Sequence, residues 1–342
     1  MLSAFSRVYG KIISYRNLLY TNRHIEARSL GRPTISIGNI TVGGTGKTPL
    51  TALIAELLYE MDERVCIISR GYGRRNPKES VLVCNQTEIL ATADFAGDEP
   101  FELAKQLLGR ALVISDGDRI RAAKRILDEF DVSVFVLDDG FQHRRAKRDL
   151  DIVVIDATNP FGNGKTLPAG ILREPLTGLT RADFFIITRA DLVSEVESIK
   201  KEIRKYNQSG TITIAETFTN SIKAFGTDQT ENLERFRSES KNYVFCGIGN
   251  PEAFVKQLDK ERFTVAGSRF FRDHAKYTQQ AIAKIEKAAE KCGANRLLTT
   301  PKDATKLVKL NFNLPCFVVA SKVRIEKLHD LWKEIDKILL RN

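Results

Sequence analysis

Residues 43–48, GGTGKT, form a glycine-rich loop that few folds can accommodate. An apolar run at residues 34–40 precedes the loop, and leucine and isoleucine at helical spacing follow it. A strand, a glycine turn and a helix in this order are typical of a phosphate-binding loop, because backbone N–H groups of the turn and of the helix N-terminus can hold phosphate oxygens. Lys47 would then reach the β and γ phosphates of a nucleotide, and the Thr48 hydroxyl would bind Mg²⁺. The residues expected to bind the nucleotide are Thr41, Val42, Gly43, Gly44, Thr45, Gly46, Lys47 and Thr48.

The loop departs from the usual pattern G-x-x-x-x-G-K-[ST], because Thr41 stands where the first glycine belongs. Its spacing matches instead the GGxGK[ST] loop of ParA/MinD-like P-loop proteins. Many of those proteins carry a lysine at the position of Val42 and use it across a nucleotide-bound dimer, so valine there argues against such a switch. A membrane-associated ATPase of this kind and an ATP-dependent enzyme of the dethiobiotin-synthetase kind stay open as alternatives, and we expect a monomer.

From residue 34 to about residue 215, apolar runs alternate with helical patterns. Continuous runs of valine, isoleucine and leucine that alternate with helices indicate a parallel sheet covered on both faces. We therefore expect an α/β fold of the P-loop NTPase type, with a mostly parallel sheet. The expected strands lie at 34–40, 64–69, 111–115, 132–139, 151–156, 183–188 and 211–215, and the expected helices begin near Pro49, Pro100, Arg119 and Glu195.

A polar stretch at residues 216–240 has no strong period and is expected to connect to a second unit. After it, strands and helices alternate again up to a last helix that ends at Leu340. The expected domains are an amphipathic helix at 1–25, a P-loop domain at 26–220 and a smaller C-terminal α/β domain at 221–342 that completes the active site.

Composition limits the kind of partner. The net charge of +10 indicates an anionic partner, which could be nucleic acid, a phosphorylated substrate or an anionic membrane surface. The five cysteines are scattered and mostly lie in apolar runs, as reduced thiols of a cytoplasmic protein do. Because no apolar run approaches the roughly 18 residues that span a bilayer, we expect neither a transmembrane nor a secreted protein.

Residues 1–20 have the pattern of a basic amphipathic helix, although Gly10 and Arg16 interrupt it. Such a helix either packs on its own domain or lies on a membrane surface, where its cations would favour anionic lipid headgroups. The polar side carries Ser3, Arg7, Lys11 and Ser14, and the apolar arc contains Leu2, Phe5, Val8, Tyr9, Ile12, Ile13 and Leu19.

Carboxylates occur where metal binding or proton transfer would need them. Asp138 and Asp139 end an apolar strand, and such residues beside a phosphate loop either hold Mg²⁺ or its water or are ordinary turn aspartates. Asp98, two residues before Pro100, is either a helix cap or a base for an attacking hydroxyl. In the second domain Asp273 precedes His274, and a capping aspartate beside a surface histidine explains this pair equally well.

Further polar residues occur where loops would touch a ligand, and we expect substrate contacts from Tyr72, His143, Arg173 and Glu174. An arginine at a strand end can clamp a phosphate or can pair with a surface acid. The segment TRAD at 188–191 loosely resembles the base-reading motif of GTPases, but arginine replaces its lysine and the signal is weak.

Together these segments resemble the tetraacyldisaccharide 4'-kinase family of lipid A biosynthesis. The resemblance covers nearly the whole chain, and its most specific segments are LDDGFQHR at 137–144 and GILREP at 170–175. It implies a P-loop kinase that transfers the γ-phosphoryl group of ATP to the 4'-hydroxyl of tetraacyldisaccharide 1-phosphate and forms lipid IVA, with ATP and Mg²⁺ as cofactors. The preference for ATP over GTP is implied by the family alone.

The resemblance also implies roles for single residues. Asp98 and His274 match the family's catalytic pair, in which the histidine would orient and tune the aspartate as it takes the hydroxyl proton. Asp138 and Asp139 match its metal-handling carboxylates, and the matches to its substrate or transition-state contacts are Arg119, His143 and Arg173. Because the catalytic pair comes from two domains, the active site is expected to close between them.

The implied partner is the lipid A disaccharide substrate at an anionic membrane surface, and no nucleic acid. The implied location is peripheral, on the cytoplasmic face of the bacterial inner membrane. A substrate with four acyl chains stays in the membrane, so the N-terminal amphipathic helix would hold the enzyme at the headgroup plane.

Overall fold

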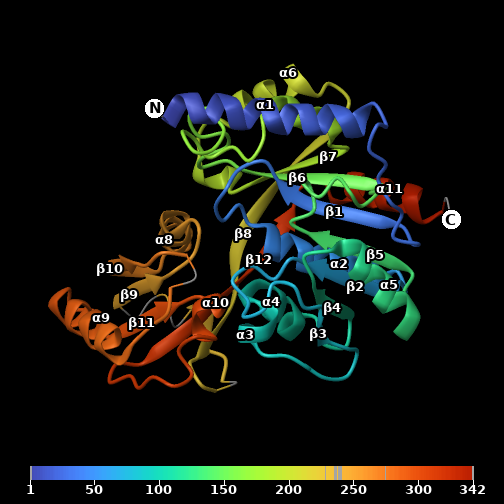
Figure 1. Cartoon of the computed structure of the whole chain (residues 1–342). Coiled ribbons are helices and arrows are strands. Elements are labelled where there is room, and N and C mark those ends of the chain that lie inside the picture. The colour runs from blue at the N-terminus through green and yellow to red at the C-terminus, as the bar shows by residue number, and fades with distance from the viewer. Residues whose placement is uncertain (1, 228, 235–236, 238–240, 274, 341–342) are drawn as a thin grey trace. The chain divides into compact units, whose positions relative to one another are not determined.

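The chain divides into two compact units in the computed structural model, which describes residues 2–227, 229–234, 237, 241–273 and 275–340 (Figure 1). Unit 1 comprises Met1–Glu216 and Ile325–Asn342, and unit 2 comprises Thr217–Arg324. The second unit is therefore an insertion between the body of the first unit and its last helix. His274 lies outside the described residues.

Unit 1 is built on a sheet whose strands follow the order β8-β7-β6-β1-β5-β2-β4-β3. All neighbouring strands in it are parallel except β3 and β4, which are antiparallel. Because β1 lies between β5 and β6, the loop that follows β1 emerges among the carboxyl ends of those strands. The strands are β1 (Thr34–Asn39), β2 (Val65–Ser69), β3 (Val81–Cys84), β4 (Ala111–Ser115), β5 (Val134–Asp138), β6 (Leu150–Asp156), β7 (Phe184–Thr188) and β8 (Thr211–Ala224), of which β8 continues into unit 2.

Helices cover this sheet through their apolar residues. Helix α2 buries Leu50, Ile54 and Leu58 completely, and helix α5 buries Ala122 and Ile126. Continuous burial along the central strands explains their unbroken valine, isoleucine and leucine runs. The helical elements of unit 1 are α1 (Leu2–Thr21), α2 (Lys47–Glu60), α3 (Ala93–Ala96), α4 (Asp98–Gln106), α5 (Arg119–Glu129), η1 (Leu176–Arg181), η2 (Ala190–Leu192), α6 (Val196–Tyr206) and α11 (Leu328–Leu339).

Unit 2 is a smaller α/β unit whose sheet follows the order β10-β9-β11-β12-β8. Strand β9 is parallel to β10 and β11, and β11 is parallel to β12. Two clusters of buried apolar side chains, one around Phe254 and one around Phe245, form its core. Its elements are β9 (Lys241–Cys246), α8 (Pro251–Lys260), β10 (Thr264–Phe270), α9 (Gln279–Lys291), β11 (Arg296–Thr299), α10 (Pro301–Ala304) and β12 (Cys316–Ile325).

Two sequence-based expectations need correction in these regions. The polar stretch at 216–240 does not begin as a loop, because β8 continues to Ala224 and buries Thr219 and Ile222. The expected domain at 221–342 includes α11, yet α11 belongs to unit 1, where it buries Leu331 and Ile335. An amphipathic pattern predicts that a helix has a buried face but does not say which sheet covers it.

The N-terminal helix α1 lies along one edge of unit 1 beside α6 (Figure 1). It buries its small residues Ser6 and Gly10 and turns its large apolar residues outward. No helix of the described residues has the length and apolarity needed to cross a bilayer. The outward residues, each more than half exposed, are Leu2, Phe5, Val8, Ile12, Tyr15 and Leu18.

Candidate active site

The glycine loop has the backbone shape of a phosphate cradle. Gly43 and Gly46 have φ angles of 109° and 83°, which residues with a side chain rarely adopt. Helix α2 begins at Lys47, and Gly46, at its N-cap, has no side chain that could satisfy the first N–H groups. Those N–H groups and the positive end of the helix dipole are therefore available to an anion.

The loop is held from behind by the end of β7. The Thr188 hydroxyl donates to the Thr45 carbonyl at 2.9 Å, and the Arg189 guanidinium donates to the Gly44 carbonyl at 2.8 Å. Arg189 also forms an ion pair with Asp156 at the end of β6. The TRAD segment thus fixes the phosphate loop through Thr188 and Arg189, a role that sequence reasoning missed.

Lys47 and Arg173 converge on one carboxylate beside the loop. The Lys47 Nζ lies 3.5 Å from Asp139 Oδ1, and the Arg173 Nη1 donates to both Asp139 oxygens at 2.8 and 2.7 Å. Burial alone would raise the pKa of Asp139, but the charges of Lys47 and Arg173 outweigh it and lower this pKa to about 2. A permanently ionised carboxylate therefore holds two cations next to the place where phosphates would bind.

Asp138 has a different environment from its neighbour. It is fully buried and accepts hydrogen bonds from the Ser69 hydroxyl at 2.9 Å and the Thr51 hydroxyl at 3.4 Å. Burial, with the charges of Glu99 and Asp139, raises the pKa of Asp138 to about 6, although Lys47 opposes this. Two adjacent carboxylates thus have pKa values on opposite sides of the ordinary aspartate range.

The raised pKa of Asp138 predicts a pH-dependent stability. The native carboxyl keeps its proton in a range, from about pH 4 to about pH 6, in which the unfolded chain has lost it, so stability falls as pH rises through this range. Asp138→Asn is expected to raise the free energy of unfolding at pH 8 by up to about 3 kcal/mol and to change it little near pH 4. Urea unfolding at both pH values measures this, with the exposed Asp131→Asn as control; equal effects at both pH values would contradict the expectation.

Arg119 lies close to the same two carboxylates, and His143 lies close to Arg119. Arg119 is buried at the start of α5 and donates to the Asp116 and Gly117 carbonyls at 3.3 and 3.2 Å. Its burial lowers the pKa of the guanidinium, while the charges of Asp139 and Asp138 oppose this shift. Burial and the charge of Arg119 lower the pKa of His143 to about 4, so that this imidazole is neutral at pH 7. A guanidinium keeps its proton in proteins, so Arg119 is a cation near the strand ends. His143 can serve beside it only as a neutral donor or acceptor.

Asp98 is not the cap of its helix. The N-cap of α4 is Gly97, with a φ of 94°, and Asp98 is the first helical residue. A side chain at Gly97 would collide with the turn at Gly71 and Tyr72, so the start of α4 packs on the loop that follows β2. The charge of the next residue, Glu99, raises the pKa of Asp138, which shows that Glu99 lies near it. This end of α4 therefore lies near the carboxyl ends of β2 and β5. Asp98 thus belongs to the same region as the phosphate loop.

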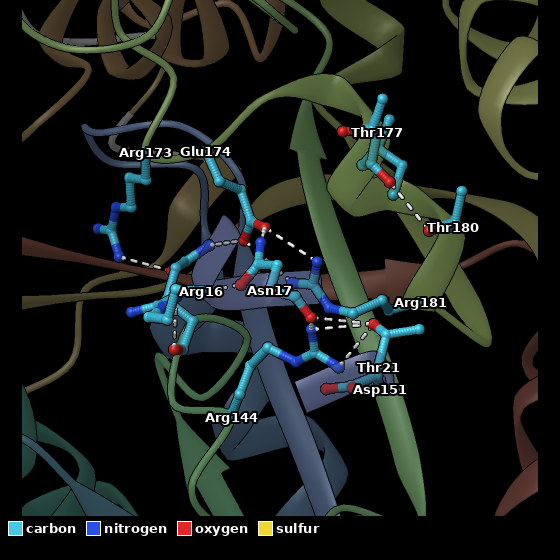
Figure 2. A network of polar contacts seen from close by, with 12 residues as sticks. Arg16, Asn17, Thr21, Arg144, Asp151, Arg173, Glu174, Thr177, Thr180 and Arg181 are labelled. Carbon is cyan, nitrogen blue, oxygen red and sulfur yellow. Dashed lines mark hydrogen bonds and ion pairs between the residues drawn. The ribbon is translucent and has the colours of Figure 1, made fainter. Parts of the chain in front are cut away.

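Glu174 is a structural link and not an open substrate contact. It is fully buried, and its carboxylate accepts hydrogen bonds from Arg181 at 2.9 and 3.1 Å, from Asn17 at 2.8 Å and from Gln142 at 3.0 Å (Figure 2). These bonds join α1, η1 and the turn after β5. Arg173, its neighbour, faces Asp139 as described above, and Tyr72 is exposed on the turn after β2.

The polar groups near the loop suit Mg²⁺ that is bound together with a nucleotide. Among the described residues, no cluster of three or more histidine, cysteine or acidic side chains is arranged to hold a metal by itself. Mg²⁺ usually takes one or two carboxylates, a hydroxyl, phosphate oxygens and water. Asp138 would supply the carboxylate and the half-buried Thr48 the hydroxyl, whereas the oxygens of Asp139 already face Lys47 and Arg173.

Comparison with known proteins identifies the family. The model of the tetraacyldisaccharide-1-P 4'-kinase family matches residues 1–340. A tetraacyldisaccharide 4'-kinase of Halothermothrix orenii is 35% identical over 354 residues, covering 98% of this chain and 92% of that protein. The corresponding enzyme of Geobacter sulfurreducens is 36% identical over 340 residues, with 99% and 93% coverage.

A solved structure supports the same assignment. The crystal structure of LpxK from Aquifex aeolicus in complex with ATP is 31% identical, covers 98% of both chains and has a TM-score of 0.76. The match extends through both units and α1, so the expected α/β P-loop fold is confirmed. This match favours the kinase family over the ParA/MinD-like and dethiobiotin-synthetase-like alternatives. The chain belongs to the tetraacyldisaccharide-1-P 4'-kinase family.

Proposed function

We propose that the phosphate loop of unit 1 holds ATP for transfer of its γ-phosphoryl group to the 4'-hydroxyl of tetraacyldisaccharide 1-phosphate, the reaction that forms lipid IVA. The chain is an ATP-dependent kinase of this family. The observation that supports the assignment of the site is the convergence of Lys47 and Arg173 on Asp139 beside an uncapped helix N-terminus. Phosphoryl transfer needs little more than positioning and neutralisation of charge, which such a cluster supplies.

Each residue of the cluster has a part in this proposal. The N–H groups of residues 43–48 bind the phosphates, and Lys47 moves from Asp139 to the β and γ oxygens when ATP binds. Arg173 and the buried Arg119 neutralise the charge that develops on the transferred group. Asp98 accepts the proton of the 4'-hydroxyl, because its position at the start of α4 brings a half-buried carboxylate to the edge of this region.

Mg²⁺ would be held by Thr48, Asp138 and the phosphates of ATP, and would supply further neutralisation of phosphate charge. His274, which the family resemblance pairs with Asp98, lies outside the described residues and stays a prediction. We also propose that the enzyme acts as a monomer.

The activity is tested with γ-labelled ATP and tetraacyldisaccharide 1-phosphate in mixed micelles. The expected product is the lipid labelled at the 4' position, formed only when a divalent cation is present. Labelled inorganic phosphate without labelled lipid would show an ATPase and would contradict the kinase assignment. Formation of labelled lipid at an equal rate in excess chelator would contradict the assignment of Mg²⁺.

We further propose that α1 places the enzyme on the cytoplasmic face of the bacterial inner membrane as a peripheral protein. The helix presents its large apolar side chains to the outside and its small ones to the protein, the reverse of a helix that only covers a core. Cations on α1 and just after it would meet anionic headgroups, since Arg7, Lys11, Arg23 and Arg28 are exposed.

This placement predicts a loss of membrane binding without a loss of fold. Phe5→Gln combined with Ile12→Gln removes two side chains that are 59% and 61% exposed and contribute little to the core. Burying each in a bilayer contributes on the order of 1–2 kcal/mol, so partition into phospholipid vesicles should fall at least about tenfold while the melting temperature stays the same. Vesicle sedimentation measures the partition, and Asn22→Gln, at an exposed polar position directly after the helix, is the control. Unchanged partition of the double variant would exclude α1 as the membrane contact.

A further inference from the structure

A hollow of about 750 Å³ lies along α1 within unit 1. Its size is that of a site for a small molecule and exceeds what a single inorganic ion needs. One wall belongs to α1, and the other belongs to the segment around residues 164–177 and to the end of α6. The side chains that give the hollow its chemistry are Ser3, Arg7, Lys11, Ser14, Lys165 and Thr177.

Small residues on α1 bring the helix close to the loop at Thr166 and so form the floor of this hollow. The Ser6 hydroxyl donates to the Thr166 carbonyl, and the Thr166 hydroxyl donates to the Ser6 carbonyl at 2.8 Å. A side chain at Gly10 would come within 3.3 Å of the Thr166 hydroxyl oxygen. The helix is therefore held close to the loop along one line, and the longer side chains one helical step away, Arg7 and Lys11, form the wall beside it.

The hollow is positively charged and rich in hydroxyl groups. Arg7, Lys11 and Lys165 line it, and no acidic residue does so among those described. In the part of the chain that the structure describes, none of these three cations forms an ion pair. Guanidinium, ammonium and hydroxyl donors that converge without an acid favour a ligand with anionic oxygens, such as a phosphate ester.

The hollow lies on the other flank of α1 from the candidate active site. The flank toward the active site carries Tyr9, whose hydroxyl donates to the Arg173 carbonyl at 2.9 Å, and Arg16, which donates to the Gln142 carbonyl at 3.4 Å. The exposed apolar arc with Phe5, Val8 and Ile12 runs between the two flanks. A ligand in the hollow therefore has its phosphate beside cations and its remaining part beside an apolar surface.

We propose that this hollow binds the phosphate headgroup of an anionic glycerophospholipid of the surrounding membrane, at a site separate from that of the kinase substrate. The apolar arc next to the hollow accommodates the acyl chains, which a free phosphate does not have. Such a bound lipid fixes the rotation of α1 about its axis at the membrane surface. It thereby holds the opposite flank, with the active site, in a constant orientation to the headgroup plane.

The test uses the full chain and short-chain lipids below their micelle-forming concentration. Dihexanoyl phosphatidylglycerol is expected to bind at one saturable site in isothermal titration calorimetry. Dihexanoyl phosphatidylcholine and inorganic phosphate are expected to bind at least about tenfold more weakly. Lys165→Gln should weaken binding of phosphatidylglycerol about fivefold, and Thr177→Val should weaken it by a similar factor although it removes no charge. Lys201→Gln, which removes an exposed charge from α6 outside the hollow, is the matched control and should change the affinity less than twofold.

Several outcomes would overturn the proposal. Equal weakening by Lys201→Gln and Lys165→Gln, or no effect of Thr177→Val, would mean that general surface charge attracts the lipid. Competition between phosphatidylglycerol and tetraacyldisaccharide 1-phosphate would assign the hollow to the substrate. Binding of inorganic phosphate with equal affinity would remove the lipid as the ligand. None of these outcomes bears on the kinase activity, which the labelled-ATP assay tests separately.

Discussion

Replacing Lys47 with alanine is expected to lower the rate of lipid phosphorylation about 10²–10³-fold, the range seen when one preorganised charge donor is removed from a reaction site. The Lys47 side chain is only 12% exposed and its ammonium lies 3.5 Å from Asp139, so it is already held beside the phosphate loop. Alanine leaves the glycine turn and helix α2 unchanged, because neither depends on the lysine side chain. The loss should therefore appear in initial rates with γ-labelled ATP and not in the circular dichroism spectrum.

Two further variants make this result specific. Lys47→Arg keeps the charge but places a broad planar guanidinium where a compact ammonium is needed, and it should recover little activity. Lys124→Ala removes an exposed lysine of α5 in the same unit and should leave the rate within twofold. If Lys47→Ala retained more than a tenth of the parent rate, Lys47 would not be the phosphate contact that we propose.

Those parts of the candidate site that are continuous in sequence were predictable. The loop at 43–48 follows an apolar strand and the pair Asp138–Asp139 lies at the end of one, and the helical spacing after the loop shows where the chain turns. Parallel strands place their carboxyl ends at one edge of the sheet, so these segments had to meet once the α/β class was recognised. For these segments, the local spacing of apolar residues is sufficient to predict that they belong to the site.

Contacts between distant segments could not be predicted in this way. Thr188 and Arg189 bind the carbonyls of Thr45 and Gly44 across 143 and 145 residues, and only the order of strands in the sheet brings them together. The weak resemblance of TRAD to a base-reading motif drew attention to the correct segment for a different reason. The usable signal was a polar pair at the end of an apolar strand, where Thr188 is the last residue of β7 and Arg189 follows it.

Burial and backbone geometry account for the remaining differences. Glu174 resembled a ligand contact because it stands in a polar segment where a loop would touch a ligand. It is instead fully buried, and Arg181, Asn17 and Gln142 together satisfy its carboxylate. Asp98 resembled a helix cap because it stands two residues before a proline. Gly97 takes the cap position instead, since its φ of 94° suits a residue without a side chain.

Replacing Asp98 with asparagine is expected to lower the catalytic rate about 10²–10⁴-fold, the usual contribution of a positioned general base. The KM for ATP should stay within about twofold, because Asp98 lies at the start of α4 and the phosphates bind at the start of α2. Asparagine has nearly the same shape and keeps one acceptor oxygen for the N–H groups of the first turn. A structural role alone would therefore leave the rate almost unchanged.

The matched control is Asp94→Asn, which removes an exposed carboxylate from the first turn of the neighbouring helix α3. This variant should retain the parent rate, whereas Asp98→Glu should regain part of it by offering a carboxylate at a shifted position. Stopped-flow measurement of the first turnover separates loss of phosphoryl transfer from slow product release. A fall in rate confined to product release, or an equal fall for Asp94→Asn, would show that Asp98 does not take the hydroxyl proton. A fall in the first turnover that Asp98→Glu partly reverses is the result that only a carboxylate base at this position explains.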